Sequence, residues 1–408
     1  QELCPNGVES KKLKDVCIFV NGFAFKSNLF KASGKPVIRI TNIKNGFIDN
    51  SDIVYIDTAD YTEDLSAYLV DKDEIVIAMS GATTGKVGIN KTNDTFYLNQ
   101  RVGKFVPKQE ILNNHYLYHF LLAKQTYFYS NSGGGAQPNL STKTIKETLI
   151  PVPPIEVQSE IVRILDNFTE LTAELTAELA ARKKQYEYYR DELLKPKSDI
   201  PMVILKEIAT DIYRGSGIKR DEVTEDGIPC VRYGEIYTTY NTWFDKCVSH
   251  TKLEYVSSPK YFEYGDILFA ITGESVEDIA KSVAYVGNEK CLAGGDIVVL
   301  KHKQNPRYLA HVLATQAARE QKSKGKVKSK VVHSNVPSIE QITIPLPSLE
   351  VQERYAYVLD NFEEICNSLS IGLPAEIEAR KKQYEFYREK LLTFAEGNAI
   401  ISRQTDMT

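Results

Sequence analysis

The chain has 408 residues, of which 42% are hydrophobic and 25% charged, and its formal net charge is −4. This length is too great for one ordinary hydrophobic core, so we expect two or more domains of a soluble globular protein. The negative net charge means that any surface for nucleic acid must be local. No apolar run approaches the ~20 residues of a membrane span, so we expect no membrane segment.

The beginning of the chain and its cysteines indicate the cytoplasm. Gln1–Leu3 shows neither the basic nor the apolar part of a secretory signal. The six cysteines are scattered and form no CxxC pair. This usage is typical of a reducing compartment and of a protein without structural zinc.

Two stretches of the chain carry the same short motifs in the same order. In each, a Gly-x-Pro turn precedes an apolar strand that ends in arginine, a second apolar strand runs into a hydroxyl-glycine turn, and a short amphipathic helix follows. These patterns predict a mixed α/β domain in each stretch. Ala293–Gly295 stands where the first stretch has Asn99–Arg101, so we expect no shared role there. The matching positions are Arg39 and Arg232, Ser80 and Thr272, and Tyr116 and Tyr308.

A long helix with a repeated sequence closes each half of the chain. Arg182–Arg190 and Arg380–Arg388 agree at eight of nine positions, and Leu-Asp-Asn-Phe recurs upstream of both. Apolar residues at steps of three and four from Ile155 to Leu194 predict a coiled-coil seam along ~60 Å of helix. A helix of this length needs a partner, and its own copy can return only antiparallel. The predicted seam consists of Leu165, Phe168, Leu175, Leu179, Tyr186, Tyr189, Leu359, Phe362, Tyr384 and Tyr387.

The segment between the repeated motifs differs between the two copies. The first copy holds Thr-Ala-Glu-Leu twice, ending at Leu175 and at Leu179, where the second copy has Gly372 and Pro374. The second segment is four residues longer, which is close to one helical turn, so the seam can keep its phase. We expect Gly372 and Pro374 to kink or interrupt the second helix. The tandem tetrapeptide is either a spacer or helix filler of good propensity.

The predicted fold class is α/β of the mixed α+β kind with an internal pseudo-two-fold repeat. Two globular domains are expected to be separated by two long antiparallel coiled-coil helices. The expected boundaries are 1–152 for the first globular domain, 153–195 for the first helical spacer, 196–346 for the second globular domain, 347–395 for the second helical spacer and 396–408 for a C-terminal tail.

Three patterns approach catalytic or metal-binding motifs without meeting their requirements. Ser80–Lys86 lacks the first glycine of a phosphate loop, and Val87 replaces the hydroxyl residue that would hold magnesium. A simple turn, or a turn that contacts a DNA phosphate, is expected instead. Asn305–Tyr308 departs from the Asn-Pro-Pro-Tyr loop of amino-methyltransferases and predicts a helix cap. His115 and His119 have no matching acid or cysteine set, so exposed helix positions explain them and no metal site is expected.

The positive signal for nucleic acid is a basic run. Arg319–Lys330 holds six basic residues and one acidic residue, at the place where the first half has Gly133–Gly135. Lysines that alternate with small residues form a flexible strap suited to phosphate contact, and a solvated loop is the alternative. Polar side chains at strand ends and turns can read base edges in the major groove. The candidate DNA-binding residues are Lys26, Arg39, Ser80, Thr83, Lys86, Gln100, Arg101, Gln137, Asn139, Arg214, Arg220, Arg232, Tyr233, Thr272, Lys324, Lys326, Lys328 and Lys330.

The duplicated motifs resemble those of one protein family. Pro-x-Pro followed by Glu-Val-Gln, Leu-Asp-Asn-Phe and Arg-Lys-Lys-Gln-Tyr-Glu-x-Tyr-Arg are similar to the specificity (S) subunits of type I restriction–modification systems, over nearly the whole chain. The tandem Thr-Ala-Glu-Leu is similar to that of the subgroup whose repeats set the target spacing. The resemblance implies that each globular domain is a target-recognition domain for one half of a bipartite double-stranded DNA target. The paired helices would set the half-site spacing and dock two methyltransferase (modification) subunits.

The resemblance also implies a prokaryotic, cytoplasmic protein with no catalytic residues and no cofactor of its own. S-adenosylmethionine, ATP and Mg²⁺ would belong to the partners, which are adenine methyltransferases and restriction subunits that translocate and cleave DNA. Two alternatives belong to other classes of function. A stand-alone DNA methyltransferase and endonuclease fusion with degenerate motifs would methylate DNA by itself. A coiled-coil scaffold would show no salt-dependent affinity for DNA.

Overall fold

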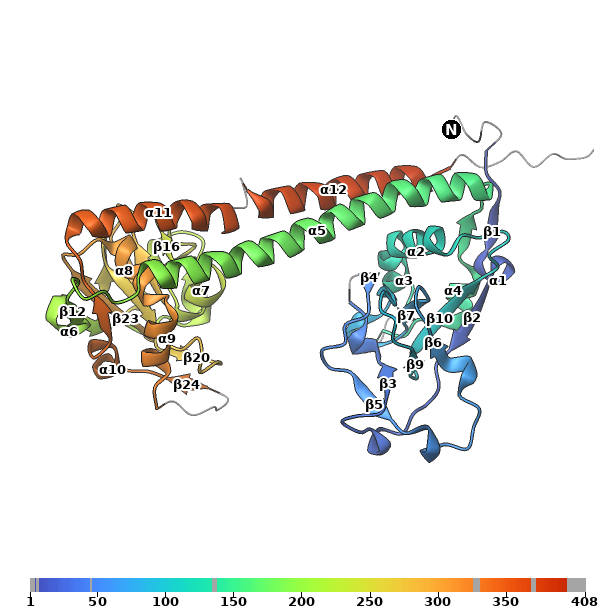
Figure 1. Cartoon of the computed structure of the whole chain (residues 1–408), viewed down its shortest axis with the longest axis horizontal. Coiled ribbons are helices and arrows are strands. Elements are labelled where there is room, and N and C mark those ends of the chain that lie inside the picture. Colours follow the sequence, from blue (N-terminus) through green and yellow to red (C-terminus); the bar gives the residue numbers. More distant parts are fainter. Residues whose placement is uncertain are drawn as a thin grey trace, which may run out of the picture. The chain divides into compact units, whose positions relative to one another are not determined.

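The chain forms two compact units that do not coincide with its two sequence halves. The computed structural model describes residues 4, 7–44, 46–133, 138–325, 331–367 and 372–394. The first unit comprises Gln1–Ala173 and Ala379–Thr408, and the second comprises Glu174–Glu378 (Figure 1). Each unit therefore combines one globular domain with helical segments from both halves of the chain. Within the described residues, no helix is both long enough and apolar enough to cross a membrane.

Two larger sheets and one two-stranded sheet form the globular part of the first unit. The central sheet has the strand order β2-β10-β7-β8-β4, the second sheet has the order β5-β3-β9-β6, and β1 pairs with β11. The apolar residues of β7 are all buried, which explains the uninterrupted apolar run of the sequence at this strand. The strands are β1 (Ser10–Lys12), β2 (Cys17–Asn21), β3 (Lys35–Ile38), β4 (Gly46–Phe47), β5 (Val54–Ile56), β6 (Leu69–Val70), β7 (Ile75–Ala78), β8 (Val87–Ile89), β9 (Phe96–Leu98), β10 (Val102–Pro107) and β11 (Leu149–Pro151).

The second unit repeats this plan. Its central sheet has the order β13-β23-β19-β21-β16, its second sheet has the order β14-β17-β15-β22-β18, and two small sheets pair β12 with β25 and β20 with β24. The strands are β12 (Met202–Ile204), β13 (Ala209–Arg214), β14 (Val223–Thr224), β15 (Ile228–Val231), β16 (Trp243–Phe244), β17 (Ser249–Thr251), β18 (Tyr261–Phe262), β19 (Ile267–Ala270), β20 (Thr272–Gly273), β21 (Ser282–Tyr285), β22 (Cys291–Ala293), β23 (Ile297–His302), β24 (Val332–His333) and β25 (Thr343–Pro345).

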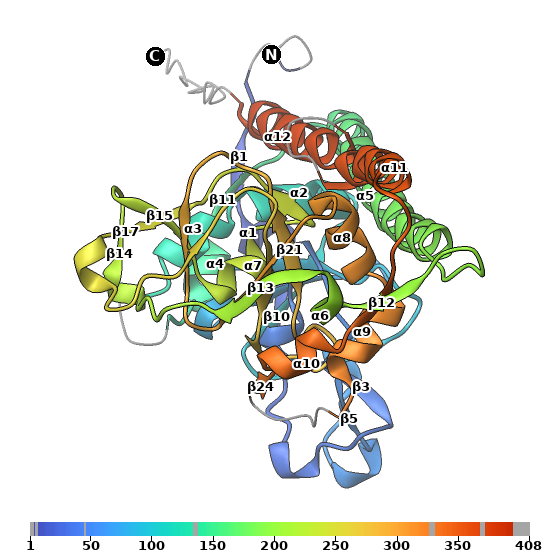
Figure 2. The same ribbon diagram turned by 90° about the vertical axis from the view of Figure 1, so that its left-hand side faces the viewer.

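Short helices accompany the sheets, and two of them have matching caps. The Asn113 and Asn305 side chains accept hydrogen bonds from first-turn amides of α2 and α8, so the helix cap predicted at Asn305 is confirmed. In the second unit, α8 packs against both β21 and the long helix α11 (Figure 2). The short helices are α1 (Leu13–Val16), α2 (Asn114–Ala123), α3 (Gln125–Ser130), α4 (Thr142–Glu147), α6 (Leu205–Ile208), α7 (Tyr233–Thr238), α8 (Pro306–Leu313), α9 (Gln316–Ser323) and α10 (Val336–Glu340).

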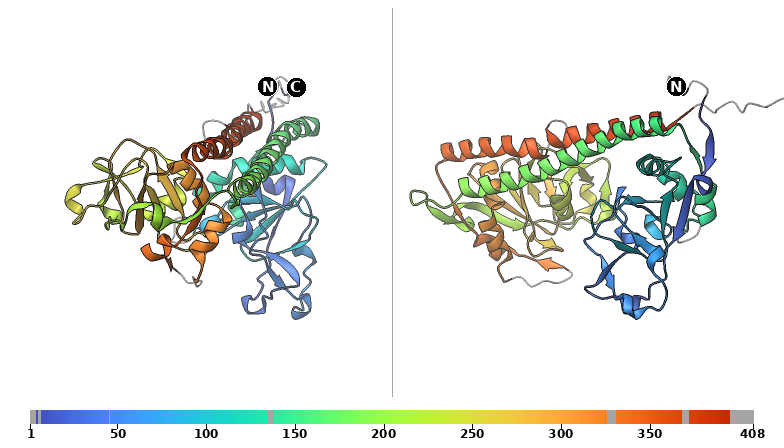
Figure 3. Two further views of the ribbon diagram at one scale, coloured as in Figure 1. Left: turned by 60° about the vertical axis from the view of Figure 1, so that its left-hand side comes forward. Right: turned by 45° about the vertical axis from the view of Figure 1, so that its right-hand side comes forward.

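The predicted long helix α5 (Ile155–Leu193) is confirmed, and it pairs with a different helix in each unit. In the first unit it lies beside α12 (Leu373–Leu392), as Figure 3 shows. Phe168 of α5 stacks on Tyr387 of α12, with ring centroids 5.4 Å apart. Leu165, further towards the N-terminus, shares a core with Leu392, so the two helices are antiparallel there.

In the second unit, α5 pairs with α11 (Leu349–Asn367). Tyr186 of α5 shares a core with Cys366 near the end of α11. Lys197, beyond the end of α5, donates a hydrogen bond of 3.3 Å to the Tyr355 hydroxyl near the start of α11. The order of these contacts shows that this pair is antiparallel as well.

The second copy of the long helix is interrupted, as its sequence predicts. α11 ends at Asn367 and α12 begins at Leu373. Gly372 has a φ of +82°, in the left-handed region that glycine enters without a steric penalty. Pro374 lies in the first turn of α12, where its missing N–H breaks no helical hydrogen bond.

Part of the predicted seam is exposed. Tyr186 is buried, but Tyr189 is 50% exposed, because a step of three residues turns it about 60° around the helix from Tyr186. Arg190, one position further, is buried instead and is only 4% exposed. Its guanidinium group lies over the Tyr186 ring. Phe362 is also 46% exposed, so the prediction of a buried seam is wrong for Tyr189 and Phe362.

The remaining seam residues follow the prediction to different degrees. Leu165 and Leu359 are fully buried. Leu175, Leu179 and Tyr384 are half-buried. Tyr387 is 40% exposed even though one face of its ring stacks on Phe168.

Candidate functional site

A buried histidine joins the globular domain of the first unit to its helix pair. His119 of α2 is fully buried, and its Nε2 lies 2.9 Å from Oδ1 of Asp166 on α5. Its Nδ1 lies 2.9 Å from the hydroxyl of Tyr384 on α12. His115, one turn earlier, places its Nδ1 2.9 Å from the other oxygen of Asp166. The prediction that exposed positions explain both histidines is therefore wrong for His119.

The second unit contains the equivalent junction. His311 of α8 is fully buried, with its Nε2 2.8 Å from Oδ1 of Asp360 on α11 and its Nδ1 3.1 Å from the hydroxyl of Tyr186 on α5. Asp360 also accepts hydrogen bonds from Trp243 Nε1 at 2.9 Å and Arg307 Nη1 at 3.1 Å. Each junction thus combines the aspartate of one Leu-Asp-Asn-Phe motif with the tyrosine of the opposite Arg-Lys-Lys-Gln-Tyr motif.

The protonation states follow from these contacts. Burial lowers the pKa of His119, so the ring is held neutral. The hydrogen bond to Asp166 raises the pKa of the half-buried His115. Burial alone would raise the pKa of Asp166, but the hydrogen bonds from His115 and His119 outweigh it and lower that pKa. Asp166 is therefore an anion that accepts from both rings.

Several predicted DNA-binding residues of the first unit lie close together just beyond the C-terminal end of β7, the middle strand of the central sheet. Ser80, two residues after the end of β7, forms a bridge with Asn139, and the Met79 N–H donates to the Arg101 carbonyl oxygen at 2.8 Å. The Arg101 guanidinium Nη1 donates to Asn139 Oδ1 at 3.0 Å. The Arg101 and Asn139 side chains are both exposed. We call Ser80, Arg101 and Asn139 the first corner.

The second unit has a corner with the same backbone frame. The Ile271 N–H donates to the Asp296 carbonyl oxygen at 2.9 Å, and β20 pairs Thr272 with His333. The Thr272 hydroxyl also lies 3.2 Å from His333 Nδ1. Arg214 donates to Asp296 Oδ1 at 2.6 Å. We call Arg214, Thr272, Asp296 and His333 the second corner.

Strand register shows which residues of the two corners are equivalent. Val102 pairs with Ala78 in the first unit as Ile297 pairs with Ala270 in the second, so Arg101 corresponds to Asp296. The equivalence expected from sequence placed Gly295 opposite Arg101 and was one residue out of register. The two units thus present opposite charges at one backbone position.

The comparisons with known proteins agree with this duplicated plan. The model of the type I restriction modification DNA specificity domain matches residues 5–182 and again residues 198–379. The chain belongs to this family of type I DNA specificity subunits. Specificity subunits supply target specificity to a restriction–modification complex and are not its catalytic components.

Individual relatives match the chain over much of their length, and solved chains share its fold. The Haemophilus influenzae protein S.HindORF215P, which bears the name of a type I restriction enzyme specificity subunit, is 29% identical over 403 residues, covering 95% of this chain and 96% of that protein. The EcoR124I/EcoR124II specificity subunit of Escherichia coli is 31% identical over 295 residues, covering 68% and 72%. A solved chain of a type I restriction–modification system shares the fold with a TM-score of 0.63 at 16% identity, covering 97% of this chain and 99% of that one. The S subunit of M. genitalium has a TM-score of 0.50 at 15% identity, covering 94% and 96%.

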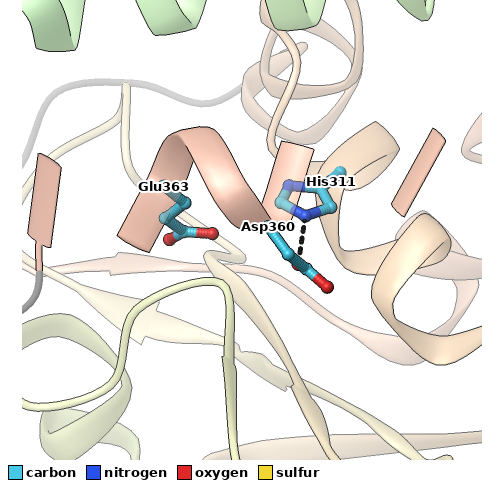
Figure 4. Close-up of side chains that lie close together, drawn as sticks. All are labelled: His311, Asp360 and Glu363. Atoms are coloured by element: carbon cyan, nitrogen blue, oxygen red, sulfur yellow. Dashed lines mark hydrogen bonds and ion pairs between the residues drawn. The ribbon is translucent and has the colours of Figure 1, made fainter. Parts of the chain in front are cut away.

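One cluster in this specificity subunit has the composition of a metal site. Ligand atoms of His311, Asp360 and Glu363 lie within 4.8 Å of one another (Figure 4). His311 Nε2 lies 2.8 Å from the Asp360 carboxylate and its Nδ1 lies 3.1 Å from the Tyr186 hydroxyl, so both ring nitrogens already have hydrogen-bond partners. The Thr242 hydroxyl and N–H donate to Oε1 of Glu363, at 2.7 and 3.2 Å. His311, Asp360 and Oε1 of Glu363 thus belong to a hydrogen-bonded network, whereas Oε2 of Glu363 is buried and has no hydrogen-bond partner among the described residues.

The described part of the basic run is mostly helical. Arg319 and Lys322 belong to α9, and Lys322 is 5% exposed. Its Nζ donates to Ser282 Oγ at 3.0 Å and to the Leu313 carbonyl oxygen at 2.8 Å, and burial lowers its pKa to about 7. The prediction of a flexible basic strap is therefore wrong for this part of the run.

The other predicted DNA-binding residues lie outside the corners. Arg39 donates to the Asp52 carbonyl oxygen at 2.8 Å, and Arg232 pairs with Glu235 at 3.0 Å, so both arginines have structural partners. The exposed candidates are Lys26, Gln100, Arg220, Tyr233 and Lys324, and Thr83 and Lys86 are half-buried. Gln137, Lys326, Lys328 and Lys330 lie outside the described residues.

The junction histidines were missed from sequence, although a signal for them existed. Tyr-Leu-x-His occurs at Tyr116–His119 and again at Tyr308–His311, at the same place in each half. A polar residue repeated on the buried face of two equivalent helices predicts a buried partner.

Removing one hydroxyl group tests the first junction. We expect Tyr384→Phe to destabilise the first unit by about 1–2 kcal/mol, because Nδ1 of the buried His119 loses its partner. Hydrogen exchange of the α2 amides should accelerate accordingly. Tyr129→Phe, on a 53% exposed ring, is the control. Equal exchange rates in the two variants would show that the Tyr384 hydroxyl does not hold the junction together.

Proposed function

We propose that this specificity subunit reads a bipartite double-stranded DNA target, with one half-site read by each unit. The observation that carries the proposal is the pair of corners. The same backbone frame occurs in both units, yet it presents Arg101 and Asn139 in one and Asp296 and His333 in the other. A shared frame with different polar side chains suits the reading of two different base sequences.

The helices are proposed to set the distance between the half-sites. α5 is unbroken from Ile155 to Leu193, and the division between the two units falls at Ala173 and Glu174, inside the tandem Thr-Ala-Glu-Leu. A change in the number of residues here alters the length of α5, which runs unbroken across this division, as α12 does at Glu378 and Ala379. This supports placing the subunit in the subgroup with spacer repeats.

We also propose that the helices dock two methyltransferase subunits. Exposed aromatic side chains recur at the same positions of the repeated motif, with Tyr188 62% and Phe386 59% exposed. Tyr189 and Tyr387 lie beside them and are 50% and 40% exposed. Exposed aromatic clusters of this kind mark protein–protein interfaces. S-adenosylmethionine would bind in these methyltransferase partners, and ATP and Mg²⁺ would act with the restriction subunits.

The experiment is to assemble the chain with its cognate methyltransferase subunit and to map methylated adenines by single-molecule sequencing. The expected result is a split target with a constant spacer. The affinity of the complex for DNA should also fall linearly with salt concentration on a logarithmic plot, as phosphate contacts require. A continuous, unsplit target would overturn the proposal. Methylation by the chain alone would favour the stand-alone methyltransferase, and salt-independent or absent binding would favour the scaffold.

A further inference from the structure

We propose that Arg101 and Asn139 form the base-reading pair of the first unit, and that Arg101 recognises a guanine in its half-site. This inference rests on the proposed reading of one half-site by each unit. It adds a named residue pair and a named base to that function.

The backbone of Arg101 has an unusual conformation. Its φ is +71°, in the left-handed region that residues with a Cβ atom enter only at an energetic cost. Its carbonyl oxygen accepts the Met79 N–H at 2.8 Å, and the equivalent Asp296 accepts the Ile271 N–H at 2.9 Å without sharing the positive φ. The backbone hydrogen bond that the two corners share therefore does not require a positive φ at this position. A strained, exposed arginine where glycine would fit better indicates that the side chain is retained for a purpose other than folding.

The side chain of Arg101 has donors left for a ligand. Its Nη1 donates to Asn139 Oδ1 at 3.0 Å, which orients the guanidinium plane. Among the described residues, no carboxylate forms an ion pair with Arg101 within 4.0 Å. In the second corner, by contrast, Asp296 neutralises Arg214 at 2.6 Å. The first corner thus retains a full positive charge and a planar fork of N–H groups.

The chemistry of this pair points to a purine. The guanidinium fork matches the O6 and N7 acceptors of guanine in the major groove, and this contact is the most common specific one that arginine makes. The Asn139 carbonyl oxygen is occupied by Arg101, but its NH₂ group remains able to donate to a neighbouring acceptor. A DNA phosphate would also attract Arg101, but a phosphate contact carries no base preference. Loss of a base preference therefore distinguishes a guanine contact from a phosphate contact.

Arg101→Gly is the variant of choice, because glycine accepts a φ of +71° and the fold should be retained or stabilised. The assembled methyltransferase complex is tested on the genome-wide set of adenine sites. The expected result is loss of the preference for guanine at one position of one half-site, by roughly tenfold or more in relative methylation. The other half-site and the spacer should not change. Arg101→Lys should retain only part of the preference, since a lysine cannot make the bidentate contact.

Lys72→Ala, at an exposed lysine of the same unit outside the corner, is the control and should leave the target unchanged. Weaker methylation spread evenly over all bases in Arg101→Gly would identify a phosphate contact and overturn base reading. An unchanged split target would overturn the inference while leaving the proposed function intact. A wild-type target that is not split would instead overturn the proposed function.

Discussion

Replacing Asp360 with alanine is expected to lower the free energy of unfolding of the second unit by about 3 kcal/mol. The carboxylate accepts hydrogen bonds from His311, Trp243 and Arg307, and its side chain is only 13% exposed. Alanine would leave all three donors without this acceptor, and His311 is fully buried, so water cannot replace it there. The cost of leaving buried donors unpaired exceeds the modest net value of each hydrogen bond.

Trp243 provides the measurement, because it is the only tryptophan of the chain and lies in this network. Its fluorescence during urea unfolding reports on the second unit without a contribution from tryptophans elsewhere. Glu364→Ala, at an exposed position of the same helix, is the control and should behave like the wild type. The matching Asp166→Ala change in the first unit should cost less, because Asp166 is 37% exposed. Equal urea midpoints for Asp360→Ala and Glu364→Ala would contradict the structural role of the junction.

Deletion of Thr176–Leu179 is expected to shorten the preferred spacer of the DNA target by one or two base pairs while both half-sites stay the same. Four residues correspond to ~6 Å of helix, against about 3.4 Å for one base-pair step. Thr176, Ala177 and Glu178 are exposed and Leu179 is half-buried, so the deletion removes little packing. Four residues also make close to one turn, so the remaining side chains nearly keep their facing.

The control for this deletion keeps the length and changes the sequence. Replacing Thr176–Leu179 by four alanines should preserve the spacer, because alanine is the best helix former. Methylated adenines mapped with the assembled complex measure the spacer in each case. A deletion variant that still methylates with the original spacer would show that the length of α5 does not set the half-site distance.

Much of the fold could be predicted because the relevant signals are local. The apolar period of α5 predicted its length almost to the residue, from Ile155 to Leu193. Gly372 and Pro374 predicted the interruption of the second copy, since their backbone restrictions act wherever they occur. The internal repeat and the family resemblance likewise needed no tertiary information.

The functional sites depended on contacts that are remote in sequence. The spacing of apolar residues along α5 favoured Tyr189 as a seam residue, but packing in the second unit buries Arg190 instead. The correspondence of Arg101 with Asp296 required strand register, since a shift of one residue changes which side chain faces the site.

The sequence by itself determined that the chain is a duplicated α/β protein with two copies of one helical motif. Only the tertiary structure decided which copy of the helical motif packs against which globular domain. Tyr384 reaches His119 across 265 residues, and Tyr186 reaches His311 across 125. Both copies carry the same tyrosine, so no local preference distinguishes the pairings. The antiparallel packing of the long helices determines the pairing, because it places the Arg-Lys-Lys-Gln-Tyr motif of each sequence half against the globular domain of the other half.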